Sequence, residues 1–136
     1  MIDYSVLREL ALSSRLESLN EIEALTLELK AQFNLSDEQE ANMLVVLSEA
    51  VSNAIVHGNR FHPGRKVLLN CWQEEGRLMF SVTDEGDGFD PTRVADPTAP
   101  ENLMKPTGRG IFLMRKLADE VTFSEGGRKV TLAFRI

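Results

Sequence analysis

Apolar and polar residues repeat with two different periods along this chain of 136 residues. Apolar positions recur every three or four residues over residues 15–33 and across residues 37–57, which predicts two helices. Two short apolar runs, at residues 66–73 and 77–83, predict strands, and the EEG between them is typical of a tight hairpin. An opening strand is expected over residues 5–12.

Short polar motifs predict where these two helices begin and end. Ser13 or Ser14 is expected to cap the first helix. Ser36 and Gln39 form a capping box for the second helix, because each side chain can bond the backbone amide of the other residue. Gly58 is expected to stop the second helix.

The C-terminal part of the chain predicts one long loop and three further elements. Residues 86–107 hold four prolines and two glycines, and so long a loop in a small domain is usually functional. Residues 110–119 predict a helix. Residues 120–124 and 129–135 predict a last hairpin around Gly126-Gly127.

Together these elements predict one domain, residues 1–136, of the α+β class. Their order, β-α-α-β-β-loop-α-β-β, favours a two-layer sandwich. In that arrangement the helices cover one face of a mixed, mostly antiparallel sheet. The sequence contains no internal repeat, low-complexity tract or linker.

The charge balance and the cysteine count exclude several kinds of site. The chain has 15 basic and 21 acidic residues and a formal net charge of −6, which argues against sequence-independent binding of nucleic acid. A nucleotide held with a metal ion stays possible, since local dipoles and Mg²⁺ can outweigh net charge. The single cysteine, Cys71, is expected in the core, and it allows neither a disulfide framework nor a multi-cysteine metal site.

The chain start shows no targeting segment. It lacks a basic leader followed by an apolar stretch, and no run of 18 apolar residues occurs in the sequence. We therefore expect a cytoplasmic protein with no membrane partner.

The second helix carries two polar groups that its apolar pattern does not explain. The expected core face comprises Leu44, Leu47, Val51, Ala54 and Ile55. Glu49 and Asn53 are four residues apart and stack on another face, beside Val45 and Val56. They form either a short polar surface with an internal hydrogen bond or the wall of a pocket. In a pocket, the Asn53 amide oxygen suits Mg²⁺, and the Glu49 carboxylate can position or deprotonate a nucleophile. No role is assigned to His57.

The segment VTDEGDGFDP, residues 82–91, ends a predicted strand with acids and glycines. Asp84 follows the strand directly, where a buried carboxylate can accept a hydrogen bond from an exocyclic amine, as in adenine. Gly86 and Gly88 let the backbone turn sharply and let a ligand approach closely. An ordinary Asp/Gly turn between strands is the alternative.

A second glycine-rich segment, TGRGIFLM at residues 107–114, leads into a predicted helix. Gly108 and Gly110 are expected to precede that helix, where free backbone amides can bind phosphate oxygens. Arg109 and Lys105 could meet the phosphate charge, or each could be an ordinary solvated charge.

These three elements occur in a specific order: Glu-x-x-x-Asn on a helix, Asp-x-Gly-x-Gly after a strand, and Gly-x-Gly before a helix. The P-loop pattern Gly-x-x-x-x-Gly-Lys-Ser/Thr is absent. The segments SEAVSNAIVHG, DEGDGFDP and GRGIFLMRKLADEV resemble the three boxes of the GHKL (HATPase) ATP-binding family, which includes gyrase, a heat-shock chaperone, histidine kinases and mismatch-repair ATPases. Within that family the chain is most similar to the small bacterial anti-sigma factor serine/threonine kinases.

The resemblance implies a site for ATP and Mg²⁺. Glu49 matches the family's general base, which orients or deprotonates the substrate hydroxyl. Asn53 matches the residue that holds Mg²⁺ against the phosphates, and Asp84 matches the acid that reads adenine. Gly86 and Gly88 match the turn that lets adenine in. Gly108, Arg109 and Gly110 match the phosphate-side end of the lid, which spans about residues 89–109.

One position departs from the family pattern. Members often carry a threonine in the last hairpin, on the adenine side. Here the matching place holds Arg128 or Lys129, and Thr131 is expected to be offset from it. This departure affects the contacts to adenine rather than the fold.

By resemblance, the chain is expected to be a homodimeric regulatory kinase. It would transfer the γ-phosphoryl group of ATP to a serine or threonine of an anti-sigma antagonist protein, and in its other state it would hold a sigma factor. One alternative is an ATP-binding module that sequesters a partner without kinase activity. Another is the catalytic domain of a histidine kinase. This second alternative is weakened because the chain has no dimerising helical pair with a phosphoacceptor histidine: His57 and His62 lie in or beside the first box instead.

Overall fold

The computed structural model describes residues 6–87 and 106–136. Its helices and strands, in chain order, are β1 Val6–Ser13, α1 Leu19–Phe33, α2 Asp37–Asn53, β2 Lys66–Glu74, β3 Arg77–Thr83, α3 Pro106–Leu117, β4 Glu120–Ser124 and β5 Lys129–Arg135. This order of elements is the predicted one. Within the described residues, no helix is long and apolar enough to cross a membrane.

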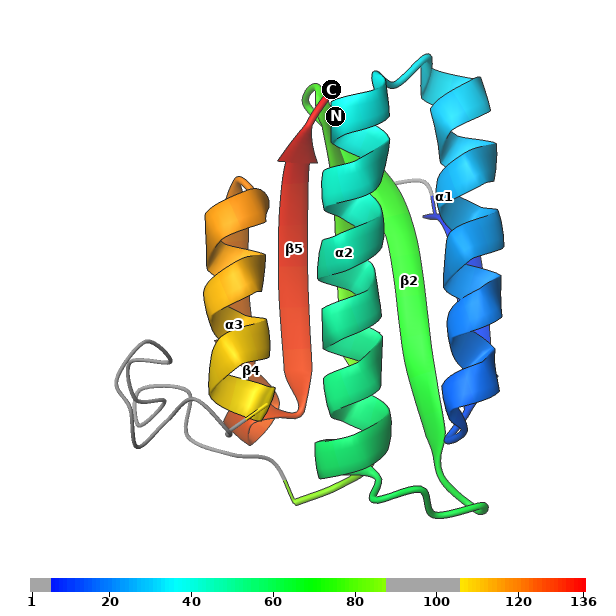
Figure 1. The fold of residues 1–136 in the computed structure, drawn as a ribbon, viewed down its shortest axis with the longest axis vertical. Coiled ribbons are helices and arrows are strands. Elements are labelled where there is room, and N and C mark those ends of the chain that lie inside the picture. The colour runs from blue at the N-terminus through cyan, green and yellow to red at the C-terminus, as the bar shows by residue number, and fades with distance from the viewer. Residues whose placement is uncertain (1–5, 88–105) are drawn as a thin grey trace.

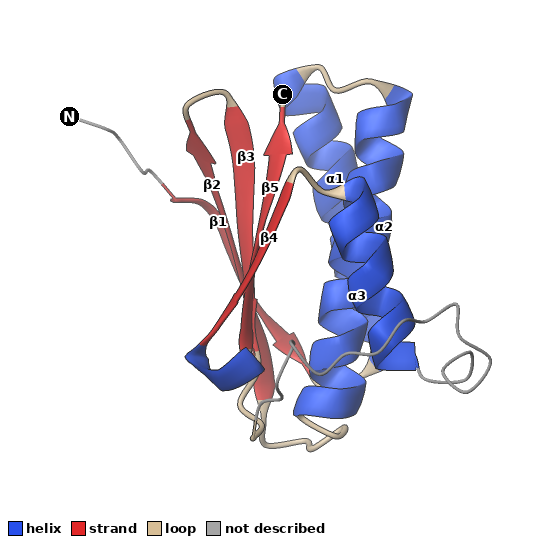
Figure 2. Cartoon of the chain, turned by 90° about the vertical axis from the view of Figure 1, so that its left-hand side faces the viewer, coloured by secondary structure: helices blue, strands red, loops and turns tan. Residues whose placement is uncertain are grey.

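The sheet has five strands in the order β1-β2-β3-β5-β4, and each neighbouring pair is antiparallel. All three helices lie on one face of this sheet, with α2 between α1 and α3 (Figure 1). The side view in Figure 2 shows the two layers edge on. The α+β sandwich is therefore confirmed, and the expected admixture of parallel pairing is not found among the described strands.

The core lies between the two layers because alternate strand residues point toward the helices. Leu69, Phe80 and Leu132 from the three central strands are fully buried against Leu47 and Val51 of α2 and other apolar residues. Burying such side chains supplies most of the driving force for folding.

Cys71 is one of these core residues, as predicted. Its side chain is fully buried. Burial raises the pKa of the thiol to about 12, so the group stays protonated and unreactive at neutral pH.

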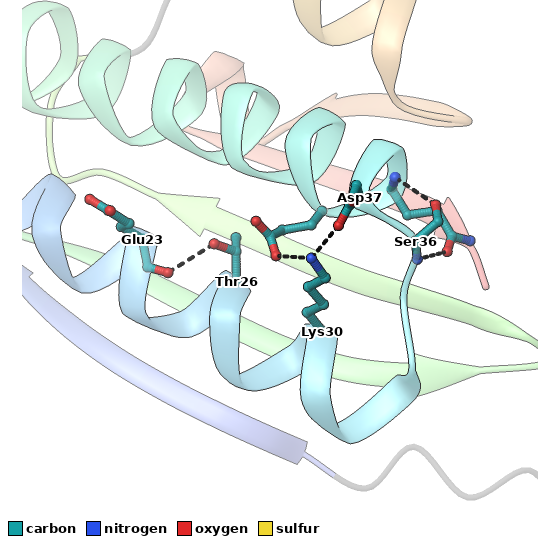
Figure 3. A network of polar contacts seen from close by, with 7 residues as sticks. Glu23, Thr26, Lys30, Ser36 and Asp37 are labelled. Carbon is teal, nitrogen blue, oxygen red and sulfur yellow. Dashed lines mark hydrogen bonds and ion pairs between the residues drawn. The ribbon is translucent and has the colours of Figure 1, made fainter.

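The start of α2 is fixed by the predicted capping box. The Gln39 backbone amide donates to Ser36 Oγ over 3.0 Å, and the Ser36 amide donates to Gln39 Oε1 over 2.8 Å. Figure 3 shows this box together with Lys30 of α1, whose ammonium group pairs with Asp37 and Glu40. Residues close in sequence thus define this end of the helix, apart from the bridge to α1.

The start of α1 differs from the prediction. Neither Ser13 nor Ser14 caps the helix, which follows a 3-10 turn at Leu16–Ser18. Ser13 belongs to β1, and its hydroxyl lies 2.9 Å from that of Ser18. The buried Ser14 donates its hydroxyl to the carbonyl of Arg65, so a local bond takes up the Ser13 side chain and a tertiary bond takes up that of Ser14.

Both predicted hairpins are present. Glu75 and Gly76, at the turn between β2 and β3, have φ values of 43° and 78°. Gly126 and Gly127, between β4 and β5, have φ values of 67° and 90°. Positive φ is the conformation in which glycine is strongly preferred, which explains the glycine in each turn.

Helix α3 begins four residues earlier than predicted, at Pro106 rather than residue 110. Proline suits the first position of a helix because its fixed φ is helical and its missing amide is not needed there. The last residues assigned to the lid, 106–109, are therefore helical. The remainder of that segment, residues 89–105, lies outside the described residues.

Candidate functional site

A cleft that is partly open to solvent lies between α2, α3 and the ends of β3 and β5. Its lining residues are Ala50, Asn53, Ala54, His57, Gly58, Val82, Asp84, Met114, Phe123, Gly127, Arg128 and Val130. Most of the side chains are apolar, and a few polar groups interrupt them. That composition is typical of a site for a flat, partly polar organic ligand.

The end of α2 forms one wall of the cleft, and its geometry differs from the prediction. The helix passes into a π-helical turn at Ala54–Gly58, and Asn59 follows in right-handed helical conformation. Gly58 is therefore not a left-handed stop. Its missing side chain serves another purpose, because a Cβ atom at Gly58 would overlap the Asp84 carboxyl group.

Asp84 lies directly after β3, at the polar end of the cleft. Its backbone amide donates to the Arg128 carbonyl over 2.9 Å, and its Oδ1 accepts from the Gly86 amide over 2.8 Å. Burial raises the pKa of the half-buried carboxyl group, although the Gly86 amide and the positive charges of Arg128 and Arg65 oppose this shift. Beside apolar walls, such a carboxyl group is suited to accept a hydrogen bond from an amine.

Gly86 is required for a different reason than predicted. It is not among the described glycines with positive φ, so it does not make a left-handed turn. Instead, a Cβ atom at Gly86 would overlap the carbonyl group of Gly58. The two glycines allow the end of α2 and the segment after β3 to touch, with Asp84 held between them. Gly88 lies outside the described residues.

Glu49 and Asn53 of α2 face Gly110 of α3. A Cβ atom at Gly110 would lie 2.8 Å from Glu49 Oε2 and 2.9 Å from Asn53 Nδ2. Asn53 lines the cleft, whereas Glu49 is partly exposed one helical turn away. The structure thus brings together a carboxylate, an amide and the backbone of α3 at one end of the cleft.

The expectation that Gly108 and Gly110 precede the helix is wrong, since both lie within α3. Gly110 is buried and allows the helix to pack onto α2. Arg109 is exposed, next to this contact. Lys105 lies outside the described residues, so its expected place beside a phosphate stays a prediction.

The last hairpin supplies Arg128 to the cleft, as the departure from the family pattern suggested. Val130, two residues further, also lines the cleft. Thr131 is not part of the lining: it pairs with Ser81 and Thr122 in the sheet register, and strand residues alternate between faces. Thr131 therefore lies outside the cleft lining, and its place relative to adenine stays a prediction.

Sequence reasoning missed the apolar lining of the cleft. Val82 and Val130 were assigned to strands but not to a site, although strand alternation puts both on the helix-covered face. Met114 and Phe123 join them from α3 and β4. The Arg115 guanidinium lies over the Phe123 ring, 5.8 Å from its centre, in a cation–π contact.

Comparison with known proteins identifies a family of ATPase domains and a group of similar bacterial proteins. Residues 12–134 match the family described as "Histidine kinase-like ATPase domain". An anti-sigma F factor of Bacillus cytotoxicus is 34% identical over 95 residues, which are 67% of this chain and 64% of that protein. An anti-sigma F factor of Geobacillus stearothermophilus is 32% identical over 108 residues, 76% of this chain and 73% of that protein.

A solved structure supports the fold alone. The RsbU and RsbW domains of a Mycobacterium tuberculosis protein align with a TM-score of 0.65 at 17% identity, over 94% of this chain and 31% of that one.

Proposed function

The chain belongs to the histidine kinase-like ATPase domain family, and we propose that it is an anti-sigma regulatory kinase. It would bind ATP with Mg²⁺ in the cleft and transfer the γ-phosphoryl group to a serine or threonine of an antagonist protein. In its other state it would hold a sigma factor. The family assignment implies ATP as the ligand, and the anti-sigma F factors at about 30% identity support the regulatory role.

One observation carries the proposal: Asn53 and Asp84 line the same cleft, and Glu49 lies one helical turn from Asn53, beside Gly110 of α3. The Asp84 carboxylate would accept the exocyclic amine of adenine. Val82, Met114 and Val130 are apolar neighbours of that position and would cover the faces of the base. The phosphates would then extend toward Asn53 and α3.

The residues around Gly110 fit a magnesium ion that arrives with phosphate. Among the described residues, no group of three or more histidine, cysteine, aspartate or glutamate side chains could hold a metal on its own. Mg²⁺ usually takes one or two protein oxygens and completes its shell with phosphate and water, and Asn53 with Glu49 close by offers such oxygens. When bound, Mg²⁺ supplies charge neutralisation between the phosphates.

Glu49 would act as the general base. It would take the proton of the substrate hydroxyl while the hydroxyl oxygen bonds to the γ-phosphorus and the bond from that phosphorus to the bridging oxygen breaks, leaving ADP. Phosphorylation adds negative charge to the antagonist and would change which partner the protein holds. Homodimerisation stays a prediction.

The direct test mixes the protein with γ-labelled ATP, Mg²⁺ and candidate antagonist proteins, beside a Glu49→Ala variant. We expect a labelled serine or threonine, and a transfer rate about 10²- to 10⁴-fold lower in the variant because the base is missing. Glu38→Ala, the same substitution at an exposed position of α2, is the matched control and should transfer normally.

The other outcomes separate the alternatives. ATP binding without transfer to any candidate would favour a module that sequesters its partner without kinase activity. Label on a histidine would favour a histidine-kinase catalytic domain. If the protein bound no ATP, the proposed function would be wrong.

A further inference from the structure

Asn59 is a fully buried polar residue directly after the π-helical turn of α2. In the sequence it belongs to a polar loop, and no motif marks it as a functional residue. Its backbone amide donates to the Ala54 carbonyl over 2.7 Å, five residues back, which is the hydrogen bond that defines a π turn. The extra residue in this turn rotates Asn59 away from solvent and into the molecule.

All the side-chain hydrogen bonds of Asn59 have partners from other segments. Its Oδ1 accepts from the Glu85 backbone amide over 2.7 Å. Its Nδ2 donates to the Lys66 carbonyl over 3.0 Å and to Ser14 Oγ over 3.1 Å. A backbone amide can only donate and a carbonyl can only accept, so the orientation of the Asn59 amide is fixed by its partners.

These bonds join four separate segments of the chain. Ser14 follows β1, Lys66 begins β2, Glu85 follows β3, and Asn59 itself ends the turn of α2. The Ser14 hydroxyl in turn donates a hydrogen bond to the Arg65 carbonyl over 2.6 Å, which completes the network. A buried network with every member satisfied is rigid and specifies one geometry.

The hydrogen bond from the Glu85 amide to Asn59 links this network to the segment that lines the cleft. Three successive backbone amides after β3 are each held: that of Asp84 by the Arg128 carbonyl, that of Glu85 by Asn59, and that of Gly86 by Asp84 Oδ1. Only the middle bond comes from a side chain elsewhere in the chain. Asn59 therefore ties the segment that carries the Asp84 carboxyl group to the end of α2.

We propose that Asn59 is a positioning residue for adenine selection, a role that rests on the proposed ATP site. It holds the backbone directly after Asp84 through the Glu85 amide, so that the carboxyl group meets the exocyclic amine of the base. Asn59 touches no ligand in this account; it acts through Glu85 and Asp84. Removing its amide deletes the bonds to the Glu85 N–H and the Lys66 carbonyl and lets the Asp84 segment shift.

The test compares binding of ATP and of ITP, whose base carries a carbonyl oxygen where adenine has the amine. In the wild type we expect a clear preference for ATP. In Asn59→Ala the ratio of the two affinities should fall about tenfold, the effect of losing about one well-placed hydrogen bond. A variant that is only less stable would bind both nucleotides more weakly by the same factor, so the ratio of the two affinities would not change.

Three further variants keep the test decisive. Asn59→Asp retains an oxygen that can accept from Glu85, so it should keep most of the preference while losing stability. Ser14→Ala removes a different bond of the network and should also keep the preference. Thr26→Ala removes a buried hydroxyl of α1, bonded to the Glu23 carbonyl over 2.9 Å and outside the cleft lining, and it serves as the stability control.

Hydrogen exchange of the nucleotide-free protein gives a readout that does not depend on ATP. The Glu85 and Gly86 amides should exchange faster in Asn59→Ala than in Ser14→Ala. An unchanged ratio of ATP to ITP affinity in a folded Asn59→Ala variant would overturn the inference while leaving the proposed function intact. A wild type that binds neither nucleotide would overturn both.

Discussion

The two ends of helix α2 are built on different principles. The N-terminal end is defined mainly by neighbours in sequence, since Ser36 and Gln39 bond each other's backbone amides. The C-terminal end is defined by contacts across the fold, where Gly58 and Asn59 meet the segment after β3. The local end stabilises the helix, whereas the non-local end also shapes the cleft. Substitutions at the two ends should therefore have different consequences for stability and for nucleotide binding.

The largest effect is expected for Gly86→Ala. The new Cβ atom would overlap the Gly58 carbonyl, which is backbone and cannot rotate away. We expect a loss of about 1–3 kcal/mol in the free energy of unfolding, typical of overpacking, together with weaker ATP binding. Denaturant unfolding and calorimetric titration with ATP measure the two quantities.

Gly64→Ala is the matched control for this substitution. A Cβ atom there meets only the His62 side chain, with 3.0 Å to Cε1, in an exposed loop. It should change neither stability nor binding appreciably. Equal effects of the two alanines would contradict the close contact between Gly58 and Gly86.

A smaller effect, on stability alone, is expected for Ser36→Ala. The substitution removes the hydroxyl that accepts from the Gln39 amide and should cost about 1 kcal/mol of unfolding free energy. The affinity for ATP should stay the same, because this end of α2 is remote from the cleft. A loss of affinity in a folded Ser36→Ala protein would show that the two ends of α2 are not independent.

The smallest effect is expected for Asp84→Asn in the absence of nucleotide, and it is a slight gain in stability rather than a loss. Because burial raises the pKa of Asp84 in the folded protein, the folded state binds more protons than the unfolded state between the ordinary and the raised pKa. Stability from this group is therefore present at low pH and lost as pH rises through the raised pKa.

The amide side chain that this substitution introduces does not ionise and avoids this loss, so Asp84→Asn should melt slightly above the wild type at pH 7. The difference should shrink as pH falls below the ordinary aspartate range. Thermal melts of both proteins over a pH series measure it. A difference that grows toward acid pH would mean that the pKa of Asp84 is lowered instead.

The contrast between the two ends also shows what the sequence could predict. Periodicity and the capping motif placed most helices and strands, because these signals are local. The hairpins were predictable for the same reason, since Gly76 and Gly126-Gly127 lie where positive φ is needed. The start of α1 was not predictable, because a 3-10 turn precedes the helix and the Ser14 hydroxyl bonds the carbonyl of Arg65, 51 residues away.

The site was predictable only in its residue types. Glu49, Asn53 and Asp84 were singled out by their unusual polar positions. The reasons for Gly58, Gly86 and Gly110 could not be read from the sequence, since each accommodates a group from another element.

Asn59 is the clearest case of a residue hidden from sequence reasoning. An asparagine in a polar loop is expected at the surface, and only the π turn and three distant partners explain its complete burial. The apolar cleft lining was hidden for a related reason, since core and site share the same face of the sheet.

The measurement that tests the account most directly is calorimetric titration of ATP and Mg²⁺ into the wild type and into Asp84→Asn. We expect the wild type to bind and the folded variant to bind about ten- to a hundredfold more weakly, because a neutral amide replaces the charged acceptor of the adenine amine. Equal affinities in the two proteins would show that Asp84 does not read adenine in this cleft.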